Sequence, residues 1–328
     1  MPGPYSANST ADELVADYAD IIKGKVILTT GVSPGSLGGY FVQTVAKAKP
    51  AWLILAARNP DKLSKISSEI TSASPEVKVR TLQVDLSSFK SVRDAAATVN
   101  SWDDIPAIDV LVNNAGIMAV DYKLTEDGIE SHFATNHLGP FLFTNLIIKK
   151  LTAAKEPRIV NISSDQHRMG AIRFHDYNFD GGNTYNRWVA YGQSKTANML
   201  FTLSLAQKLG VKHNLQAYSV HPGVIIETNL TGHLDLQSAL AEMKQTDRAL
   251  GNKKGWVSEP LKTLAQGTST HVYAAFDPNL KPHNGSYLLN SRVSDPYEDT
   301  VRPYATSQVE AEKLWRLSEK LVGQEFPY

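Results

Sequence analysis

The fold of this chain is decided by the stretch Lys25-Val26-Ile27-Leu28-Thr29-Thr30-Gly31-Val32-Ser33-Pro34-Gly35-Ser36-Leu37-Gly38-Gly39. Its first six residues form a short apolar, β-rich run, which enters a glycine-rich turn that opens a helix. Doubly wound folds hold a dinucleotide pyrophosphate at such a turn, because the glycines let the backbone approach and the helix N-terminus supplies free N–H donors. The stretch therefore predicts a dinucleotide-binding unit.

The rest of the chain alternates strand-like with helix-like segments, which predicts a parallel sheet between two layers of helices. We expect strands at 25–30, 51–57, 77–84, 108–113, 158–163, 214–220 and 286–290, and helices near 36–48, 60–72, 88–100, 125–150, 188–209, 257–276 and 306–321. The expected fold is a single α/β domain over residues 1–328, Rossmann-type and doubly wound, with a mostly parallel seven-stranded sheet and helices on both faces. Residues 1–22 are an N-terminal extension, in which 11–22 could form a short amphipathic helix.

Composition narrows the class of protein. The 33 basic and 33 acidic residues balance, so nothing favours binding to nucleic acid or to an anionic membrane surface. The absence of cysteine excludes disulfides and thiolate metal sites and fits an intracellular enzyme. We find no signal peptide and no stretch near the ~20 apolar residues of a membrane helix. We therefore expect a soluble, cytoplasmic protein without a membrane span. Since His137, His167 and His221 are not spaced as a ligand set, we expect no metal.

Tyr191 and Lys195 lie four residues apart in a helix-like segment, so their side chains share one helix face. A phenol has a reference pKa of about 10, and bringing it to about 7 needs roughly 4 kcal/mol. A cation about 4 Å away, at an effective dielectric of about 20, supplies energy of that order, although burial opposes the shift. The spacing alone is common by chance and also fits an ordinary surface helix. Its interpretation depends on the motifs around it.

Two further buried-strand patterns end in small polar residues. Residues 108–112 run into Asn113-Asn114-Ala115-Gly116, and residues 158–162 run into Ser163-Ser164. Ligands collect at the carboxyl ends of parallel strands, so both ends are expected to border a binding site.

Taken together, these segments resemble the short-chain dehydrogenase/reductase superfamily. The resemblance runs from about residue 25 to about residue 289. It rests on five motifs in the family's order: the glycine turn, Asn113-Asn114-Ala115-Gly116, the serine that ends the fifth strand, Tyr191-x-x-x-Lys195, and His221-Pro222-Gly223. The runs 135–141, 190–201 and 220–224 are most similar to its retinol-dehydrogenase-like and WW-domain-oxidoreductase-like branch.

The resemblance implies hydride transfer between a nicotinamide and a carbonyl or alcohol carbon, with the protein supplying the proton. Tyr191 then takes the place of the acid/base, while Lys195 lowers its pKa and binds the nicotinamide ribose. Ser164, rather than Ser163, aligns with the serine that donates to the carbonyl oxygen. Asn136 fits the helix asparagine that holds a water in a proton relay through Lys195. Without the family, Ser164 would be a strand-end serine and Asn136 an ordinary polar helix residue.

Arg58 indicates the cofactor. It ends the second predicted strand, where a carboxylate would bind the ribose 2′-hydroxyl of NAD and an arginine accommodates the 2′-phosphate of NADP. Arg58 followed by neutral Asn59 favours NADP(H); a solvated strand-end arginine is the alternative. The glycine turn departs from the family's Thr-Gly-x-x-x-Gly-x-Gly, because Ser36 and Leu37 separate Gly35 from Gly38. The expected cofactor-binding residues are Gly31, Ser33, Gly35, Leu37, Gly38, Arg58, Asp85, Leu86, Asn113, Ala115, Gly116, Tyr191, Lys195, Pro222, Gly223, Val224 and Thr228. By itself, Asp85 would more often cap a helix.

Two segments are expected to shape the substrate site. Residues 225–255 lie where the family carries its substrate lid, and there Leu234, Leu236, Leu240 and Met243 recur at near-helical spacing. Residues 169–188 separate Ser164 from Tyr191 and carry Phe174, Tyr177, Phe179, Tyr185 and Trp188. These aromatics fit a bulky, partly apolar or aromatic substrate and, equally, a small core beneath a long loop.

The leading interpretation is an NADP(H)-dependent oxidoreductase, a carbonyl reductase or alcohol dehydrogenase acting on a bulky small-molecule ketone, aldehyde or alcohol. Two alternatives keep the fold: an NADP(H)-binding regulator, which degraded catalytic residues would indicate, and a non-redox member, which would usually lack the lid and the aromatic insert. Family members commonly pair through the helices that contain Asn136 and Tyr191, so a homodimer is possible. The N-terminal extension or the tail from about Val301 could cover that surface.

Overall fold

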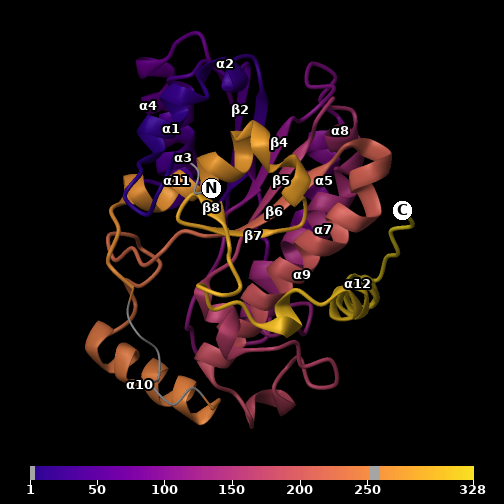
Figure 1. Ribbon diagram of the computed structural model, residues 1–328. Helices are drawn as coiled ribbons and strands as arrows, with labels where there is room; N and C mark the ends of the chain where they lie inside the picture. Colours follow the sequence, from indigo (N-terminus) through magenta and orange to yellow (C-terminus); the bar gives the residue numbers. More distant parts are fainter. Residues whose placement is uncertain (1–3, 252–258) are drawn as a thin grey trace.

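The computed structural model describes residues 4–251 and 259–328. Within these ranges a central sheet has eight strands in the order β3-β2-β1-β4-β5-β6-β7-β8 (Figure 1). Neighbours from β3 to β7 pair in parallel, and β8 pairs antiparallel with β7. The strands are β1 (Val26–Thr30), β2 (Trp52–Ala57), β3 (Lys78–Gln83), β4 (Val110–Asn113), β5 (Arg158–Ile162), β6 (Gln216–His221), β7 (Tyr287–Leu289) and β8 (Arg292–Val293). The predicted doubly wound α/β fold is confirmed.

Each of the seven predicted strands is present, and the sheet differs from the prediction by the addition of β8. This strand is only two residues long and follows a tight turn in which Asn290 and Ser291 both adopt positive φ, 52° and 54°. Two residues carry too little alternation to be recognised from sequence, and hairpin turns with positive φ more often contain glycine. The strand order reverses between β1 and β4, which is where open α/β sheets bind ligands at the carboxyl ends of their strands.

Helices cover both faces of the sheet and bury a separate apolar core on each side. One layer contains α5 (Phe89–Asn100), α7 (Gly139–Leu146), α9 (Arg187–His213) and α12 (Gln308–Val322). The other contains α1 (Ala11–Asp17), α2 (Ala19–Ile22), α3 (Leu37–Ala46), α4 (Pro60–Ala73) and α11 (Leu264–Phe276). The central strands are apolar along their length because both of their faces are covered.

The single helix predicted at 125–150 is divided into several segments in the structure. It begins at Ser131 as α6 (Ser131–Phe133), continues as one π-helical turn, η1 (Ala134–Leu138), and ends in α7 and α8 (Ile148–Thr152). Glu130 terminates the preceding loop, because its carboxylate accepts the first free N–H groups of α6. A π-turn widens a helix locally and often marks a functional site, and this one contains Asn136.

The predicted helix at 257–276 is also shorter. Positions 257 and 258 lie outside the described residues, and α11 begins only at Leu264, after the capping box of Thr263 and Gln266. In the N-terminal extension, the segment 11–22 forms α1 and α2 rather than one helix, with the break at Tyr18. The Tyr18 hydroxyl donates to Asp277 at 2.6 Å, so the extension is joined to the end of α11.

The C-terminal helix α12 lies along α9, on the side of the molecule away from α1 and α2 (Figure 1). Its Trp315 ring packs 5.0 Å from Phe141 of α7, and Phe326 packs 5.7 Å from the same ring. The His137 ring in η1 bonds to Ser318 of α12 at 2.8 Å. The tail, and not the N-terminal extension, therefore covers the surface through which family members commonly pair, and a homodimer through that surface would require α12 to move.

A candidate active site at the sheet's switch point

Two adjoining cavities open beside the carboxyl ends of the strands. The glycine-turn cavity, of about 390 Å³, lies against the β1–α3 turn and the ends of β2 and β3. The lid cavity, of about 230 Å³, lies between the end of β5 and α10 (Leu236–Ala249). Seven residues line both cavities: Leu37, Asn114, Gly116, Ile117, Met118, Thr228 and Leu230. The cavities therefore meet along a shared wall.

The predicted cofactor residues divide into three groups. Gly31, Ser33, Leu37, Arg58, Asp85, Leu86, Ala115, Gly116 and Thr228 line the glycine-turn cavity. Tyr191, Lys195, Pro222, Gly223 and Val224 line the lid cavity. Gly35, Gly38 and Asn113 line neither of them, so the structure does not bring these three to the site surface.

The glycine turn accommodates its extra residue through Ser36. The Ser36 hydroxyl caps α3 by accepting from Gly39 N–H at 3.0 Å, and it donates to the Ser33 carbonyl at 2.8 Å. A Cβ at Gly31 would lie 2.6 Å from the Ala115 Cα, and one at Gly38 would lie 2.5 Å from the Asn114 Nδ2. Only glycine permits this close approach of the turn to the end of β4. Gly38 therefore has a packing role in shaping the turn.

Asn114, rather than Asn113, belongs to the site. Asn113 turns inward and donates to Thr144 Oγ1 at 3.1 Å and to Asn161 Oδ1 at 2.9 Å. Asn114 lines both cavities, and its Nδ2 donates to the Thr30 carbonyl at 2.9 Å. Successive residues at a strand end face opposite ways, so the alternation of β4 was the signal that could have separated them.

The far end of the glycine-turn cavity is basic. Arg58, Asn59 and Lys62 line it, and Asn59 caps α4 by accepting from Lys62 N–H at 3.0 Å. Lys62 was not predicted, although its place four residues after Arg58 in the first turn of a helix could have indicated it. The Asp85 carboxylate accepts from the N–H and the hydroxyl of Ser87 in a local turn, whereas Ser88 caps α5, so the alternative that Asp85 caps this helix is wrong. The cavity therefore combines a glycine-only turn, a helix N-terminus and two cations. This combination is suited to binding a phosphorylated dinucleotide.

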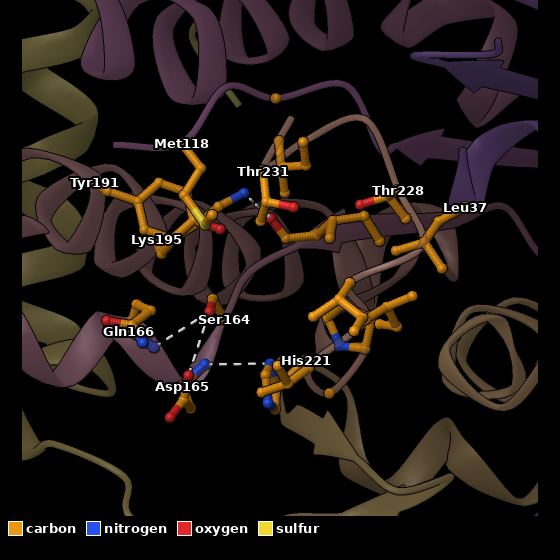
Figure 2. A pocket seen from close by; sticks show the side chains of 18 of the residues that line it. Leu37, Met118, Ser164, Asp165, Gln166, Tyr191, Lys195, His221, Thr228 and Thr231 are labelled. Carbon is orange, nitrogen blue, oxygen red and sulfur yellow. Dashed lines mark hydrogen bonds between the residues drawn. The ribbon is translucent and has the colours of Figure 1, made fainter. Parts of the chain in front are cut away.

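Ser164, Tyr191 and Lys195 meet in the lid cavity (Figure 2). Ser164 caps the 3₁₀ turn η2 (Asp165–Met169), where its Oγ accepts from Gln166 N–H at 3.2 Å. Ser164 also interacts with the hydroxyl of Tyr191 and opposes the rise in its pKa. The hydroxyl of Ser163 instead donates to the Lys195 carbonyl at 2.8 Å. Of the two serines, Ser164 is therefore the one whose hydroxyl is placed beside Tyr191.

Burial dominates the ionisation of this group. Desolvation raises the pKa of Tyr191 above its ordinary value, and the interaction with Ser164 opposes that rise only in part. Burial also lowers the pKa of Lys195 to about 7, and its Nζ lies 5.3 Å from the Tyr191 ring centre. Burial therefore decides the direction of the shift at Tyr191, and the expected lowering of this pKa by Lys195 stays a prediction. The physical reason for this direction is that both groups are buried, and neither charged form is well solvated.

Asn136 lies behind Lys195. Its Oδ1 accepts from Ile117 N–H at 2.8 Å, and its Nδ2 donates to the Ile117 carbonyl and to Ser194 Oγ, each at 2.9 Å. A Cβ at Gly116 would lie 3.2 Å from Asn136 Oδ1 and 3.6 Å from Lys195 Nζ. Asn136 thus fixes the loop that forms the shared wall of the cavities, and its part in a proton relay stays a prediction.

The lid supplies an apolar wall. Leu234, Leu236, Leu240 and Met243 all line the lid cavity, as their spacing predicted. Positions 252–255 of the predicted lid lie outside the described residues. Of the five aromatics at 174–188, only Trp188 lines the cavity. Phe179 and Tyr185 pack on each other at 5.4 Å, so this insert is mainly a small core, as one of the two alternatives stated.

Comparison with known proteins agrees with this site. The family model described as short chain dehydrogenase matches residues 25–178. Retinol dehydrogenase 12 of Bos taurus is 35% identical over 300 residues, which cover 92% of this chain and 87% of the relative. The chloroplastic short-chain dehydrogenase TIC 32 B of Brassica napus is 36% identical over 329 residues, covering 97% and 94%. A crystal structure of an uncharacterized protein from Mycobacterium paratuberculosis has a TM-score of 0.70 at 31% identity, covering 96% and 98%.

The chain belongs to the short-chain dehydrogenase/reductase family, a class of oxidoreductases that bind nicotinamide cofactors. Its relatives place it more narrowly in the retinol-dehydrogenase-like branch. No helix in the two described ranges combines the length and the apolar character that crossing a bilayer requires.

Proposed function

We propose that the protein is an NADP(H)-dependent oxidoreductase that transfers hydride between the nicotinamide and a carbonyl or secondary alcohol of a bulky apolar molecule. The observation that carries this proposal is that Ser164, Tyr191 and Lys195 line one cavity, next to the residues that also line the glycine-turn cavity. A nicotinamide that extends from the glycine-turn cavity into the lid cavity would lie beside a substrate oxygen held by Ser164 and Tyr191.

The chemistry follows from the residues present. The bound nicotinamide supplies or accepts the hydride, and the protein aligns the reacting oxygen and moves the proton. Ser164 donates a hydrogen bond to that oxygen, and Tyr191 exchanges the proton. Because burial raises the pKa of Tyr191, the phenol holds its proton at neutral pH, as reduction of a carbonyl requires. Lys195, with a pKa near 7, can give or take a proton behind Tyr191.

The preference for NADP(H) is supported by two cations at the adenosine end. Arg58 is placed to bind a ribose 2′-phosphate by hydrogen bonds, and Lys62 adds a second positive charge to the same wall. Neither the end of β2 nor the residue after Arg58 offers the carboxylate that would select NAD.

The substrate class is supported by the lid. Its leucines and Met243 face Tyr191 across the cavity, so an apolar body would be desolvated while the carbonyl reaches Ser164. The relatives named retinol dehydrogenase agree with an apolar alcohol or aldehyde. The proposed partner is therefore a small molecule. A homodimer would have to use a surface other than the one that α12 covers. A cytoplasmic location stays a prediction, and one relative is named as chloroplastic.

The test is NADPH oxidation with a panel of bulky aldehydes and ketones, comparing the unaltered protein with Tyr191→Phe. The variant keeps the ring and loses only the hydroxyl, so turnover should fall by roughly 10²–10⁴-fold while NADPH binding is unchanged. Tyr297→Phe is the matched control, since that ring is 97% exposed. Equal turnover by Tyr191→Phe would refute the assignment of Tyr191 as the acid/base. If the unaltered protein binds NADPH but reduces none of the compounds, the alternative of an NADP(H)-binding regulator is favoured.

A further inference from the structure

The peptide that joins Ser164 to Asp165 is held between two histidines. The carbonyl of Ser164 accepts from His167 Nδ1 at 2.8 Å. The N–H of Asp165 donates to His221 Nδ1 at 3.3 Å, as Figure 2 shows. On the other side of the His221 ring, Nε2 bonds to Glu259 Oε2 at 3.1 Å. These partners assign opposite tautomers: Nδ1 carries the hydrogen in His167 and the lone pair in His221.

The two histidines differ in how readily they take up a proton. Burial lowers the pKa of His167 to about 4, and its Nε2 accepts from Arg302 N–H at 3.3 Å, so this ring stays neutral. Burial alone would also lower the pKa of His221, but the hydrogen bond with Glu259 and the negative charges of Asp165 and Glu259 together outweigh it and raise that pKa. Among the described residues, the charged and titratable groups around the His221–Glu259 pair include Asp165, His167, Arg168, Lys262 and the phenol of Tyr287.

Protonation of His221 changes the hydrogen bond that it makes to the backbone. The neutral ring accepts a hydrogen bond from the Asp165 N–H at Nδ1. The protonated ring has a hydrogen on each nitrogen, so its Nδ1–H would face the Asp165 N–H and the hydrogen bond is lost. The peptide after Ser164 then loses the hydrogen bond on its N–H side, while its carbonyl keeps the two that it accepts from His167. Ser164 is the residue whose hydroxyl must point at the substrate oxygen, and errors of about 1 Å in such positioning can cost about 100-fold in rate.

We propose that His221, oriented by Glu259, is a positioning residue for the reaction: by accepting the Asp165 N–H, it aims the Ser164 hydroxyl, and it releases this hold when it is protonated. The inference rests on the proposed function, because it concerns the same site. It predicts that turnover falls on the acid side as His221 takes up its proton. Tyr191 keeps its proton throughout this range, so it does not produce this fall.

The test compares pH profiles of kcat for NADPH-dependent reduction in the unaltered protein, Glu259→Gln and His221→Asn. Glu259→Gln removes the anion that favours protonated His221, so the acid limb should move to lower pH by about one unit or more. His221→Asn keeps an acceptor near the Nδ1 position that does not titrate, so the limb should disappear while NADPH binding is unchanged. The controls are Glu76→Gln, from a surface ion pair with Lys49, and His283→Asn on an exposed turn.

An acid limb that stays in place in both variants would overturn the inference and assign the limb to Lys195, which Glu259 does not approach. A second measurement does not depend on activity: the exchange rate of the Asp165 amide, corrected for its intrinsic pH dependence, should rise as His221 is protonated. Its midpoint should fall in Glu259→Gln, and an unchanged midpoint also overturns the inference. Absence of turnover in the unaltered protein would refute the proposed function and the catalytic part of the inference, while amide exchange still decides whether His221 holds the peptide.

Discussion

Replacing Lys195 with methionine should stabilise the protein while removing its activity. The Lys195 side chain is buried, with 4% of the residue exposed, and its ammonium donates a 2.9 Å hydrogen bond to the Ile162 carbonyl. Burial lowers the pKa of this lysine from 10.5 to about 7, which means that the folded protein holds the charged form poorly. Methionine has a similar length and no charge.

The size of the effect follows from the pKa shift. A depression of about 3.5 units corresponds to about 5 kcal/mol of unfavourable burial at pH 7 and below. The lost hydrogen bond offsets about 1 kcal/mol, and the Ile162 carbonyl keeps a second donor, Asn198 Nδ2 at 2.9 Å. We therefore expect Lys195→Met to raise the free energy of unfolding by roughly 2–4 kcal/mol at neutral pH.

The predicted gain in stability depends on pH, and this dependence distinguishes it from a simple packing effect. Between pH 7 and 10.5 the unfolded chain binds a proton that the folded Lys195 does not, so the stability of the unaltered protein rises with pH across this window. The advantage of Lys195→Met should be full below about pH 7, shrink through the window and vanish above 10.5.

Urea unfolding followed by tryptophan fluorescence, repeated across that window, measures the difference. Lys208→Met is the matched control, because Lys208 lies on the same helix but is partly exposed and pairs with Glu312 at 3.1 Å. That variant should show no gain that depends on pH. A loss of stability in Lys195→Met, or a gain of equal size at every pH, would show that the lysine is held charged in the folded protein and would refute the reasoning.

Three other predictions concern the cofactor, the buried histidines and the C-terminal helix. Arg58→Asp should shift fluorescence titrations from NADPH toward NADH, whereas Arg316→Asp, at an exposed position, should not; tighter NADH binding by the unaltered protein would contradict the NADP assignment. Burial lowers the pKa of His137 to about 3 and those of His167 and His271 to about 4, so the unfolded chain binds more protons below pH 6.5 and urea midpoints should fall as the pH decreases toward 4. A flat profile would contradict this. Light scattering should give a mass near 36.0 kDa, because α12 covers the usual pairing surface; a dimer would have to use another face.

The sequence by itself determined the fold class, because its signals are local. A buried parallel strand reads as a continuous apolar run, and a glycine turn at a helix start has few other uses. These patterns identified seven of the eight strands within the described residues. The lid leucines were recognisable for the same reason, since helical spacing places one apolar face toward one cavity.

The tertiary structure decided what depends on which way a side chain turns. Asn113 and Asn114 are the same residue type in adjacent positions. Strand alternation puts them on opposite sides of β4, and the packing of β4 decides that the second reaches the cavities. Lys62 joins Arg58 only once α4 folds back beside β2. The π-turn around Asn136 depends on tertiary contacts that no local pattern displays.

Ionisation was the least accessible property from sequence. Spacing showed that Tyr191 and Lys195 share a helix face, and a pairwise charge argument then favoured a lower pKa for the tyrosine. In the folded chain burial raises the pKa of Tyr191, because a charge loses solvation in a medium of low dielectric, and the effect of Lys195 on this pKa stays a prediction. His221 bonds to Glu259 and to the peptide after Ser164 only in the folded chain. Sequence order specifies neighbours within an element, but solvation depends on everything packed around a group, and that exists only in the tertiary structure.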